Sequence, residues 1–461
     1  MQRLFAIAKL TLKAAFRYRL MQILTLLLLG AVIGLPLVIK HDGTARGFTQ
    51  ILLTYTLGTI TTLLGFATLW LACGTLARDV EECQMQMVAV KPIARWEIWL
   101  GKWTGIMLLN FLLLALSGAA VYSLMQWRSR RLPPEAQARL RSEVLVARGS
   151  LKQTVDGAAM EAEVEQQLQE RLKDSKVAGM DRDFVRKQVR ERVKAEFQIV
   201  APGGGKRFTV SAGQLKERLR GKPLQLRIKF FAAQGAPSGT YAGVWIVGPL
   251  NARRYQLEQP SLAADTFHEF AIPPNLIDDG GDLVIDFVNY NETALLFPLD
   301  DGIEVLYPEC GFGLNFIRGL GIIGCWLALL AAIGLAAASF LSFPVAAFVS
   351  LGVLVVGLSG GTVKQVVEEG GIAAINHETG RVDNPTLVDL IALPVFKALL
   401  RIINLVHGFS PIDSLSTGRS VSWEELARAV AQIVLLMGGV FAAIGIASFT
   451  RRELATAQGT Q

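Results

Sequence analysis

The sequence has few of the residues from which enzymes and metal sites are built. Its 461 residues include only four cysteines and four histidines. The cysteines form no C-x-x-C pair; they are Cys73, Cys83, Cys310 and Cys325. No histidine stands at metal-ligand spacing from a second ligand. We therefore expect no catalytic residue, no cofactor-binding residue and no metal ligand in this chain.

Charge is missing from long stretches of the sequence. Hydrophobic residues make up 51% of the chain, yet 18% of its residues are charged, so the two kinds are segregated. Six apolar runs carry no Asp, Glu, Lys or Arg away from their ends: 20–39, 50–73, 104–125, 314–340, 344–358 and 429–449. A helix of about 20 apolar residues crosses the hydrocarbon core of a bilayer. The runs predict an α-helical integral membrane protein with six transmembrane helices, three on each side of a polar insert.

Two further absences exclude ion-coupled transport and ATP binding by a P-loop. Proton- and ion-coupled transporters need ionisable groups within the membrane as relays, and these runs lack them. Residues 203–207 read Gly-Gly-Gly-Lys-Arg, without P-loop spacing and with Arg207 where Ser or Thr should stand. The chain therefore does not bind ATP in the P-loop manner, and energy for any transport should enter through a cytoplasmic loop.

Basic residues indicate the orientation. They gather before the first run, between the second and third, and after the sixth: Arg3, Lys9, Lys13, Arg17, Arg19, Arg78, Lys91, Arg95, Lys102, Arg451 and Arg452. By the positive-inside rule these segments, including both termini, face the cytoplasm, and residues 126–313 lie outside. Basic residues that flank the apolar runs, where they would meet lipid phosphates, account for much of the net charge of +7. No nucleic-acid-binding motif accompanies this charge. We expect a lipid bilayer as partner and no nucleic acid.

Two segments are predicted to lie at the membrane surface. Before the first run, Lys9, Lys13 and Arg17 recur every four residues opposite apolar side chains, which is typical of a helix in the headgroup plane. The segment 387–407 is apolar but is interrupted by Pro394 and by charges that are costly at bilayer depth. An interfacial or re-entrant helix on the outer side fits this segment better than a seventh span.

Composition divides the chain into four parts. Residues 1–125 hold the amphipathic elbow helix and the first three spans, and 314–461 hold the last three with the outer interfacial helix. Residues 126–207 are rich in charge, with apolar residues spaced by four, which predicts an extracytoplasmic helical arm. Residues 208–313 contain stretches that alternate at period two, such as 224–230, separated by turn residues. We expect an α+β insert with a β-sandwich or jelly-roll-like module.

The cytoplasmic segment 74–102 has an unusual order of residues. It begins acidic, passes through an apolar patch that includes Met85, Met87 and Val88, and turns at Lys91-Pro92. One interpretation is a short amphipathic helix that presents these apolar residues to a groove on a partner protein. A solvated loop with a helix lying on the membrane is the alternative, and the residues alone do not decide between them.

The same segment resembles a known family. The acidic cluster, the Gln-Met-Gln-Met-Val stretch, Lys91-Pro-Ile-Ala-Arg95 and Leu100-Gly-Lys102 resemble the loop after the second span of type-2 ATP-binding cassette (ABC) exporter permeases of bacteria. The ending Phe449-Thr-Arg-Arg-Glu-Leu454 is similar to the close of that family after its last span. The resemblance covers the runs, the loop and the tail, whereas the large insert departs from the simplest members.

The resemblance implies a permease of the bacterial cytoplasmic (inner) membrane that works as a homo- or heterodimer. Separate cytoplasmic ATPase subunits would bind ATP and Mg²⁺ and dock on residues 74–102. It implies coupling roles for Asp79, Glu81, Glu82, Met85, Met87, Val88, Lys91, Pro92 and Arg95. The substrate and the direction of transport stay open. A membrane-anchored scaffold or sensor, whose outer domain binds a ligand, is the rival interpretation.

Overall fold

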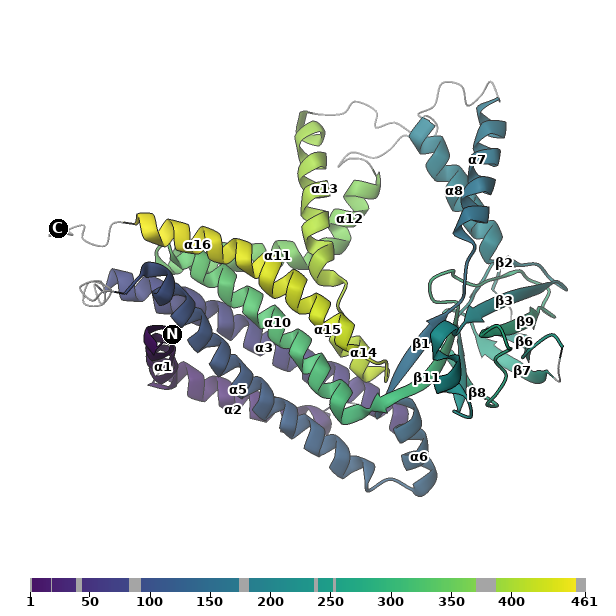
Figure 1. Cartoon of the computed structure of the whole chain (residues 1–461), viewed down its shortest axis with the longest axis horizontal. Helices are drawn as coiled ribbons and strands as arrows, with labels where there is room; N and C mark the ends of the chain where they lie inside the picture. The colour runs from purple at the N-terminus through teal and green to yellow at the C-terminus, as the bar shows by residue number, and fades with distance from the viewer. Residues whose placement is uncertain are drawn as a thin grey trace. The chain divides into compact units, whose positions relative to one another are not determined.

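The computed structural model describes residues 2–17, 19–38, 44–82, 93–173, 182–235, 239–251, 254–369 and 387–452. Contacts divide the chain into two compact units. The first, helical unit comprises residues 1–147, 310–368 and 393–461, and the second, sheet unit comprises 148–309 and 369–392. Figure 1 labels their helices and strands.

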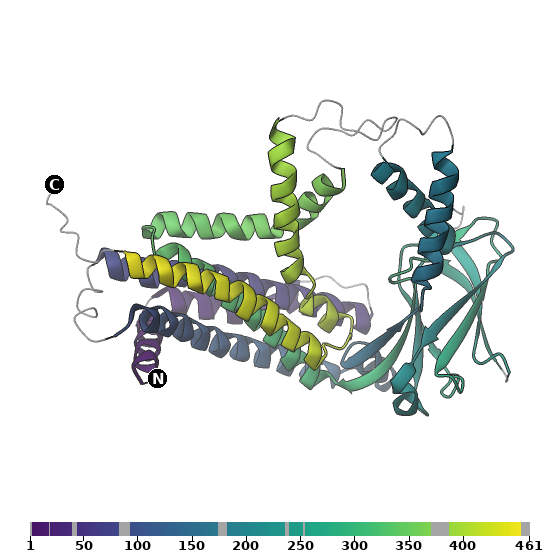
Figure 2. The same cartoon turned by 45° about the horizontal axis from the view of Figure 1, so that its top comes forward.

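Helices of six to 37 residues form most of the helical unit. They are α1 (Gln2–Arg17), α2 (Arg19–Val38), α3 (Ala45–Glu81), α5 (Arg95–Ser129), α6 (Pro134–Glu143), α10 (Phe312–Ala338), α11 (Phe343–Leu358), α12 (Gly360–Glu369), α13 (Leu387–His407), α14 (Pro411–Ser416), α15 (Trp423–Ala429), the π-helix η2 (Val430–Gly438) and α16 (Gly439–Arg451). Figure 2 shows α16 running along α10, with α13 at a steep angle to both.

Several of these helices are long and apolar enough to cross a membrane. Five qualify among the described residues: Gly47–Glu81, Arg95–Ser129, Phe312–Ala338, Ala392–Ser416 and Trp423–Arg451. A bent pair, Phe343–Leu358 with Gly360–Val367 at 57°, would make a sixth, and Ile23–Leu35 is a shorter apolar helix. The protein therefore spans a membrane. By length and composition the segment 392–416 counts among the five, although the sequence favours an interfacial or re-entrant helix there.

Helix α10 lies at the centre of the helical unit. Within its apolar window 78% of the residues are buried, against 22% for the window of Trp423–Arg451. Small residues permit this packing: a Cβ on Gly334 would lie 2.7 Å from Cβ of Ala72 in α3. A Cβ on Gly445 of α16 would lie 3.0 Å from Cα of Ala336 in α10. Such close backbone approaches are typical of helix packing in membranes.

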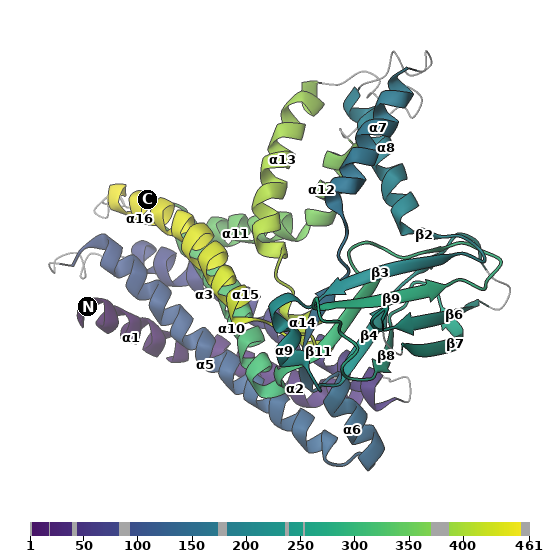
Figure 3. The same ribbon diagram turned by 45° about the vertical axis from the view of Figure 1, so that its right-hand side comes forward.

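The sheet unit holds the strands. They are β1 (Val146–Lys152), β2 (Ile199–Val200), β3 (Gly205–Ser211), β4 (Leu224–Ile228), β5 (Phe231–Ala232), β6 (Thr240–Val247), β7 (Tyr255–Ala263), β8 (His268–Ile272), β9 (Asp282–Val288), β10 (Leu295–Leu296) and β11 (Ile303–Gly311). They form sheets in the orders β1-β11-β4-β8, β3-β9-β6-β7 and β2-β10-β5. Figure 3 shows β3, β9, β6 and β7 side by side.

Alternation along the strands builds an apolar core between the sheets. Every second residue of β6 is buried, and Trp245 of that strand lies 4.4 Å between ring centroids from Phe287 of β9. Both four-stranded sheets contribute to this core, for example Leu226 from β4 and Ile285 from β9. The pairings of β4 with β8 and β11, and of β9 with β3 and β6, are antiparallel.

A helical hairpin lies between β1 and β2 in sequence. Helices α7 (Gly157–Leu172) and α8 (Arg182–Gln198) pack through five buried residues, spaced by four within each helix: Val164, Leu168, Val185, Val189 and Val193. Strand β1 lies within residues 126–207, where the sequence predicts a helical arm. Its Arg148 is buried at 3% exposure. The helix α9 (Lys216–Leu219) and the 3-10 turn Gly213–Leu215 link β3 to β4.

Candidate functional site

The predicted coupling segment is described at both of its ends. Helix α3 carries Asp79 and Glu81, Glu82 follows it directly, and Arg95 begins α5. The backbone N–H of Glu82 donates to the carbonyl oxygen of Arg78 at 2.8 Å and so closes α3. The remaining predicted residues lie outside the described part of the chain: Met85, Met87, Val88, Lys91 and Pro92.

Lys102 connects the two helices that border the segment. Its Nζ donates to Oδ2 of Asp79 at 2.5 Å and to the carbonyl oxygen of Thr75 at 2.8 Å. The Lys102 side chain is only 7% exposed, whereas that of Asp79 is 34% exposed. A buried ammonium needs both partners, because removing water from it is costly. The contact therefore fixes α5 against the last turns of α3.

Arg95 connects the segment to the end of the chain's last helix. Its Nη1 donates to the carbonyl oxygens of Phe449 at 2.6 Å, Thr450 at 2.9 Å and Arg452 at 2.6 Å. The last carbonyls of a helix have no partner within it and carry a partial negative charge. The guanidinium of Arg95 thus caps the C-terminus of α16.

Glu81 makes the complementary contact at the start of α11. Its carboxylate accepts a hydrogen bond from the backbone N–H of Phe343 at 2.8 Å, and a carboxylate at a helix N-terminus is electrostatically favourable. The Phe343 ring lies 4.4 Å below the guanidinium of Arg78 and packs edge-on against Trp70 at 5.0 Å. Glu81 therefore holds α11 to the end of α3.

A fifth helix end joins the same group. The Nη1 of Arg452 donates to the carbonyl oxygens of Ala338 at 3.4 Å and Ser339 at 3.3 Å, where α10 ends. The ends of α3, α5, α10, α11 and α16 thus meet in one network of charge-assisted hydrogen bonds. We call it the loop-end cluster, and it consists of Asp79, Glu81, Arg95, Lys102 and Arg452. The sequence singles out the first three, while Lys102 enters only as a basic flank and as part of a motif.

Helix α1 packs against α5 beside this cluster. A Cβ on Gly101 would lie 2.8 Å from Cβ of Ile7, and one on Gly105 would lie 2.7 Å from the carbonyl oxygen of Ala8. The two glycines form a G-x-x-x-G pair that admits the backbone of α1. The Leu-Gly-Lys motif of the segment therefore has two structural tasks, since Gly101 seats α1 and Lys102 binds Asp79. The spacing of the glycines could have predicted this contact.

At its other end α10 is tied to the residues before α15. The side chain of Asn315 accepts from the backbone N–H of Val421 at 2.7 Å and donates to the carbonyl oxygen of Arg419 at 2.8 Å. Arg318, which is 2% exposed, donates to the carbonyl oxygen of Val421 at 2.6 Å. The start of α15 is thus held beside the start of α10. No pattern in the sequence marks these contacts, because only the fold brings the residues together.

Two further polar contacts join helices within the helical unit. The hydroxyl of Thr68 donates to Oδ1 of Asn110 at 3.1 Å, and the Sγ of Cys73 lies 3.4 Å from Oγ of Ser350. In the described part of the chain no three His, Cys, Asp or Glu residues are grouped so as to hold a metal ion. The arrangement of the loop-end cluster suits a mechanical linkage between helices.

Comparisons with known proteins give no assignment. No protein-family model matches this chain, and no curated protein matches it significantly.

Proposed function

We propose that this chain is the membrane-spanning permease subunit of an ABC transporter of the exporter type. A separate cytoplasmic ATPase would bind ATP and Mg²⁺, dock on the segment 74–102 and drive the spans of a permease dimer. The chain itself would contribute no catalytic group. The resemblance of the segment to type-2 exporter permeases supports this assignment.

The loop-end cluster is the observation that carries the proposal. Residues 83–92 connect α3 to α5, and both flanks of this connection hold other helices: Glu81 holds α11, and Arg95 holds α16. A displacement of the loop by an ATPase would therefore reach four helices directly. A loop that served only as a connector would not need its flanks to cap two further helices.

Contacts between helix ends support six spans. The C-terminus of α10, the N-terminus of α11 and the C-terminus of α16 lie at the loop-end cluster, whereas the starts of α10 and α15 lie together at the opposite end. The chain from α11 to α15 therefore crosses the membrane a net single time. If α11 with α12 makes that crossing, α13 and α14 return to the side they started from, as an interfacial or re-entrant segment does. The steep angle of α13 to α10 supports this assignment (Figure 2).

The proposed orientation rests on charge. Arg78, Arg95, Lys102, Arg451 and Arg452 belong to helix ends that meet at the loop-end cluster, and by the positive-inside rule this gathering of basic residues supports a cytoplasmic location of that end. Both termini would be cytoplasmic, the membrane would be the bacterial inner membrane, and the sheets would form an extracytoplasmic jelly-roll-like module. A cysteine introduced at Gly204 should react with an impermeant reagent in intact cells, and one at Gln461 only after lysis. Protection of Gly204→Cys in intact cells would refute this orientation.

The scaffold or sensor interpretation has one observation in its favour. Phe231 and Phe267 are 39% and 40% exposed, and the Nζ of Lys229 lies 5.1 and 5.2 Å from their ring centroids. An exposed aromatic pair around a cation is a candidate ligand surface. Such a surface serves a sensor as well as a transporter.

Purification of the full chain from its native membrane separates the two functions. If the chain is a permease, a stoichiometric ATPase subunit should co-purify with it. The rate of ATP hydrolysis by that subunit should change when the Phe231 and Phe267 side chains are removed or when a substrate is added. A preparation that holds no nucleotide-hydrolysing subunit, but retains a ligand of the sheet unit, would favour the sensor.

A further inference from the structure

We propose that the ends of α2, α3 and α5 remote from the loop-end cluster form a binding site for an anionic phospholipid. In this site Arg128 and Ser129 bind the headgroup phosphate, and a groove between α2 and α5 receives an acyl chain. The proposal concerns a different part of the helical unit from the coupling segment and does not depend on transport.

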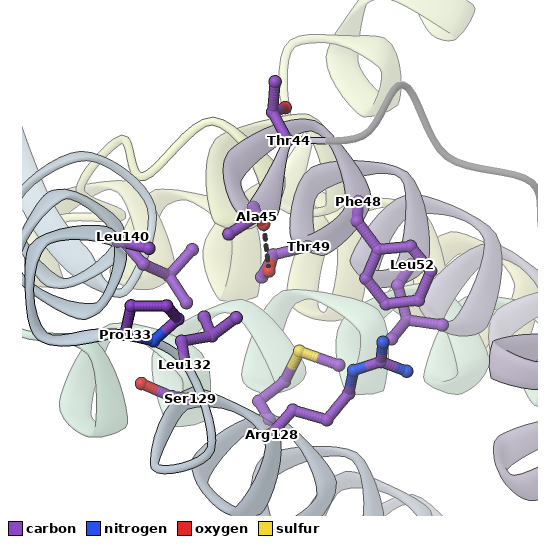
Figure 4. A pocket seen from close by; sticks show the side chains of 12 residues that line it. Thr44, Ala45, Phe48, Thr49, Leu52, Arg128, Ser129, Leu132, Pro133 and Leu140 are labelled. Atoms are coloured by element: carbon purple, nitrogen blue, oxygen red, sulfur yellow. Dashed lines mark hydrogen bonds between the residues drawn. The ribbon is translucent and has the colours of Figure 1, made fainter.

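The headgroup pocket lies between the first turns of α3, the last turn of α5 and α6, and has a volume of about 360 Å³. Figure 4 shows Leu132, Pro133 and Leu140 on one side of it and Phe48 on the other. Most of its lining is apolar. Its charged lining residue is Arg128.

Arg128 presents a positive charge at this pocket. Its guanidinium lies 4.0 Å from the centroid of the Phe48 ring, and the side chain is half-buried. Among the described residues Arg128 forms no ion pair with a carboxylate. A cation that is partly removed from water, with an aromatic ring as neighbour, attracts an anionic group.

Ser129 adds a second, independent observation. The residue is 1% exposed, lines the same pocket, and its Oγ has no hydrogen-bond partner in the described part of the structure. Buried hydroxyls are normally paired, so an orphan in a pocket lining indicates a missing acceptor or donor. A phosphate oxygen would accept from Ser129. The N-terminus of α3, capped by Thr44, faces the same pocket with the positive end of its helix dipole.

The acyl groove explains why the ligand would be a lipid rather than free phosphate. A second hollow of about 470 Å³ lies between α2 and α5 and is lined by Val32, Ile33, Ala120, Leu124 and Trp127 together with Arg128 and Ser123. Arg128 therefore lines both hollows, one partly polar and the other almost wholly apolar. Both volumes fall within the roughly 300–1,000 Å³ range of small-molecule sites. A molecule with an anionic head and an apolar chain matches the pair.

Quenching by brominated lipids tests the site, because Trp127 lines the groove. The full chain in neutral detergent is titrated with brominated phosphatidylglycerol and, in parallel, with brominated phosphatidylcholine; Trp127→Phe identifies the signal of this residue. We expect saturable quenching by the anionic lipid. Arg128→Gln and Ala120→Phe should each weaken binding about ten-fold, since one removes the charge and the other fills the groove. Ser129→Ala should weaken binding about three-fold without altering the fold.

Matched controls distinguish a built site from general attraction. Arg131, which is exposed and lies 3.8 Å over the Trp127 ring, lines neither hollow, and Ala119 is the exposed neighbour of Ala120. Arg131→Gln and Ala119→Phe should leave the affinity within two-fold. Equal losses of affinity in the Arg128→Gln and Arg131→Gln variants would overturn the proposal, as would equal binding of phosphatidylcholine. Displacement of the lipid by inorganic phosphate, together with an unchanged affinity of Ala120→Phe, would also overturn it.

Discussion

The Nη1 of Arg95 lies 2.6 Å from the carbonyl oxygen of Phe449, although 354 positions separate the two residues in the chain. Arg95 stands at the edge of the predicted coupling loop, and Phe449 stands in the last turn of the last membrane helix. The same Nη1 also reaches the carbonyl oxygens of Thr450 and Arg452. One side chain thus links the loop to the end of α16.

Removal of this cap should destabilise the end of α16. We expect Arg95→Gln to lower the free energy of unfolding by about 2 kcal/mol, since hydrogen bonds from a charged group contribute about 1.5–3 kcal/mol. Hydrogen exchange of the last turn of α16 and thermal unfolding in detergent measure the effect. The matched control is Arg428→Gln, whose exposed partner Glu424 lies four residues away, and it should cost less than about 0.5 kcal/mol. Equal costs for both variants would contradict the capping role.

Local patterns could predict much of the architecture. The alternation in 224–230 corresponds to β4, and the four-residue spacing of Val164 and Leu168 corresponds to α7. Long runs such as 314–340 correspond to membrane helices because length and hydropathy act locally. These features need only the residues within one element.

The rest depends on contacts between distant segments. The pairs of Arg95 with Phe449 and Asn315 with Val421 carry no local signal. A polar side chain near a helix end does not indicate in the sequence which distant residue it contacts. Strand β1 has no local signal either, because its charged Arg148 is buried by partners across the sheet, among them Glu269 at 2.9 Å. The segment 387–407 stays ambiguous by composition, and only the contacts at both ends of α10 restrict its topology.

The pair of Lys102 and Asp79 should behave as a coupled unit. Lys102→Met leaves the carboxylate without its partner, whereas the double variant Asp79→Leu with Lys102→Met replaces both charges by apolar groups. We expect the single variant to cost about 1–3 kcal/mol of unfolding free energy and the double variant to cost less than the sum of the singles. A double-mutant cycle by thermal unfolding measures this, and strictly additive costs would show that the contact contributes nothing.

Asp286 should make the stability of the sheet unit dependent on pH. The guanidinium of Arg207, with a further hydrogen bond from Arg254, lowers the pKa of this carboxyl. A carboxyl whose pKa is lower in the folded than in the unfolded state stabilises the fold when it is ionised. This stabilisation is complete above about pH 4, the ordinary pKa range of a carboxyl, and is lost as the pH falls through the folded-state pKa. Asp286→Asn should therefore unfold at a lower temperature than the parent at pH 7, and the difference should shrink below about pH 4. A difference that is constant from pH 7 to pH 3 would exclude this cause.

If the segment 74–102 binds an ATPase, a charge in its apolar patch should weaken that binding, and Val88→Asp introduces such a charge. Removal of an apolar anchor at the centre of an interface typically costs about 1–4 kcal/mol, whereas a charge at its rim costs far less. Glu81→Ala should accordingly be milder and sensitive to salt. The control Gly157→Asp adds the same charge where a side chain meets nothing within 4 Å.

The measurement is the amount of ATPase that co-purifies with each full-length variant, together with its hydrolysis in reconstituted membranes. We predict that Val88→Asp inserts into the membrane normally but loses the ATPase or uncouples hydrolysis from transport, while Gly157→Asp retains both. If Val88→Asp keeps its ATPase and its coupled activity, the segment is only a connector and the permease account is wrong.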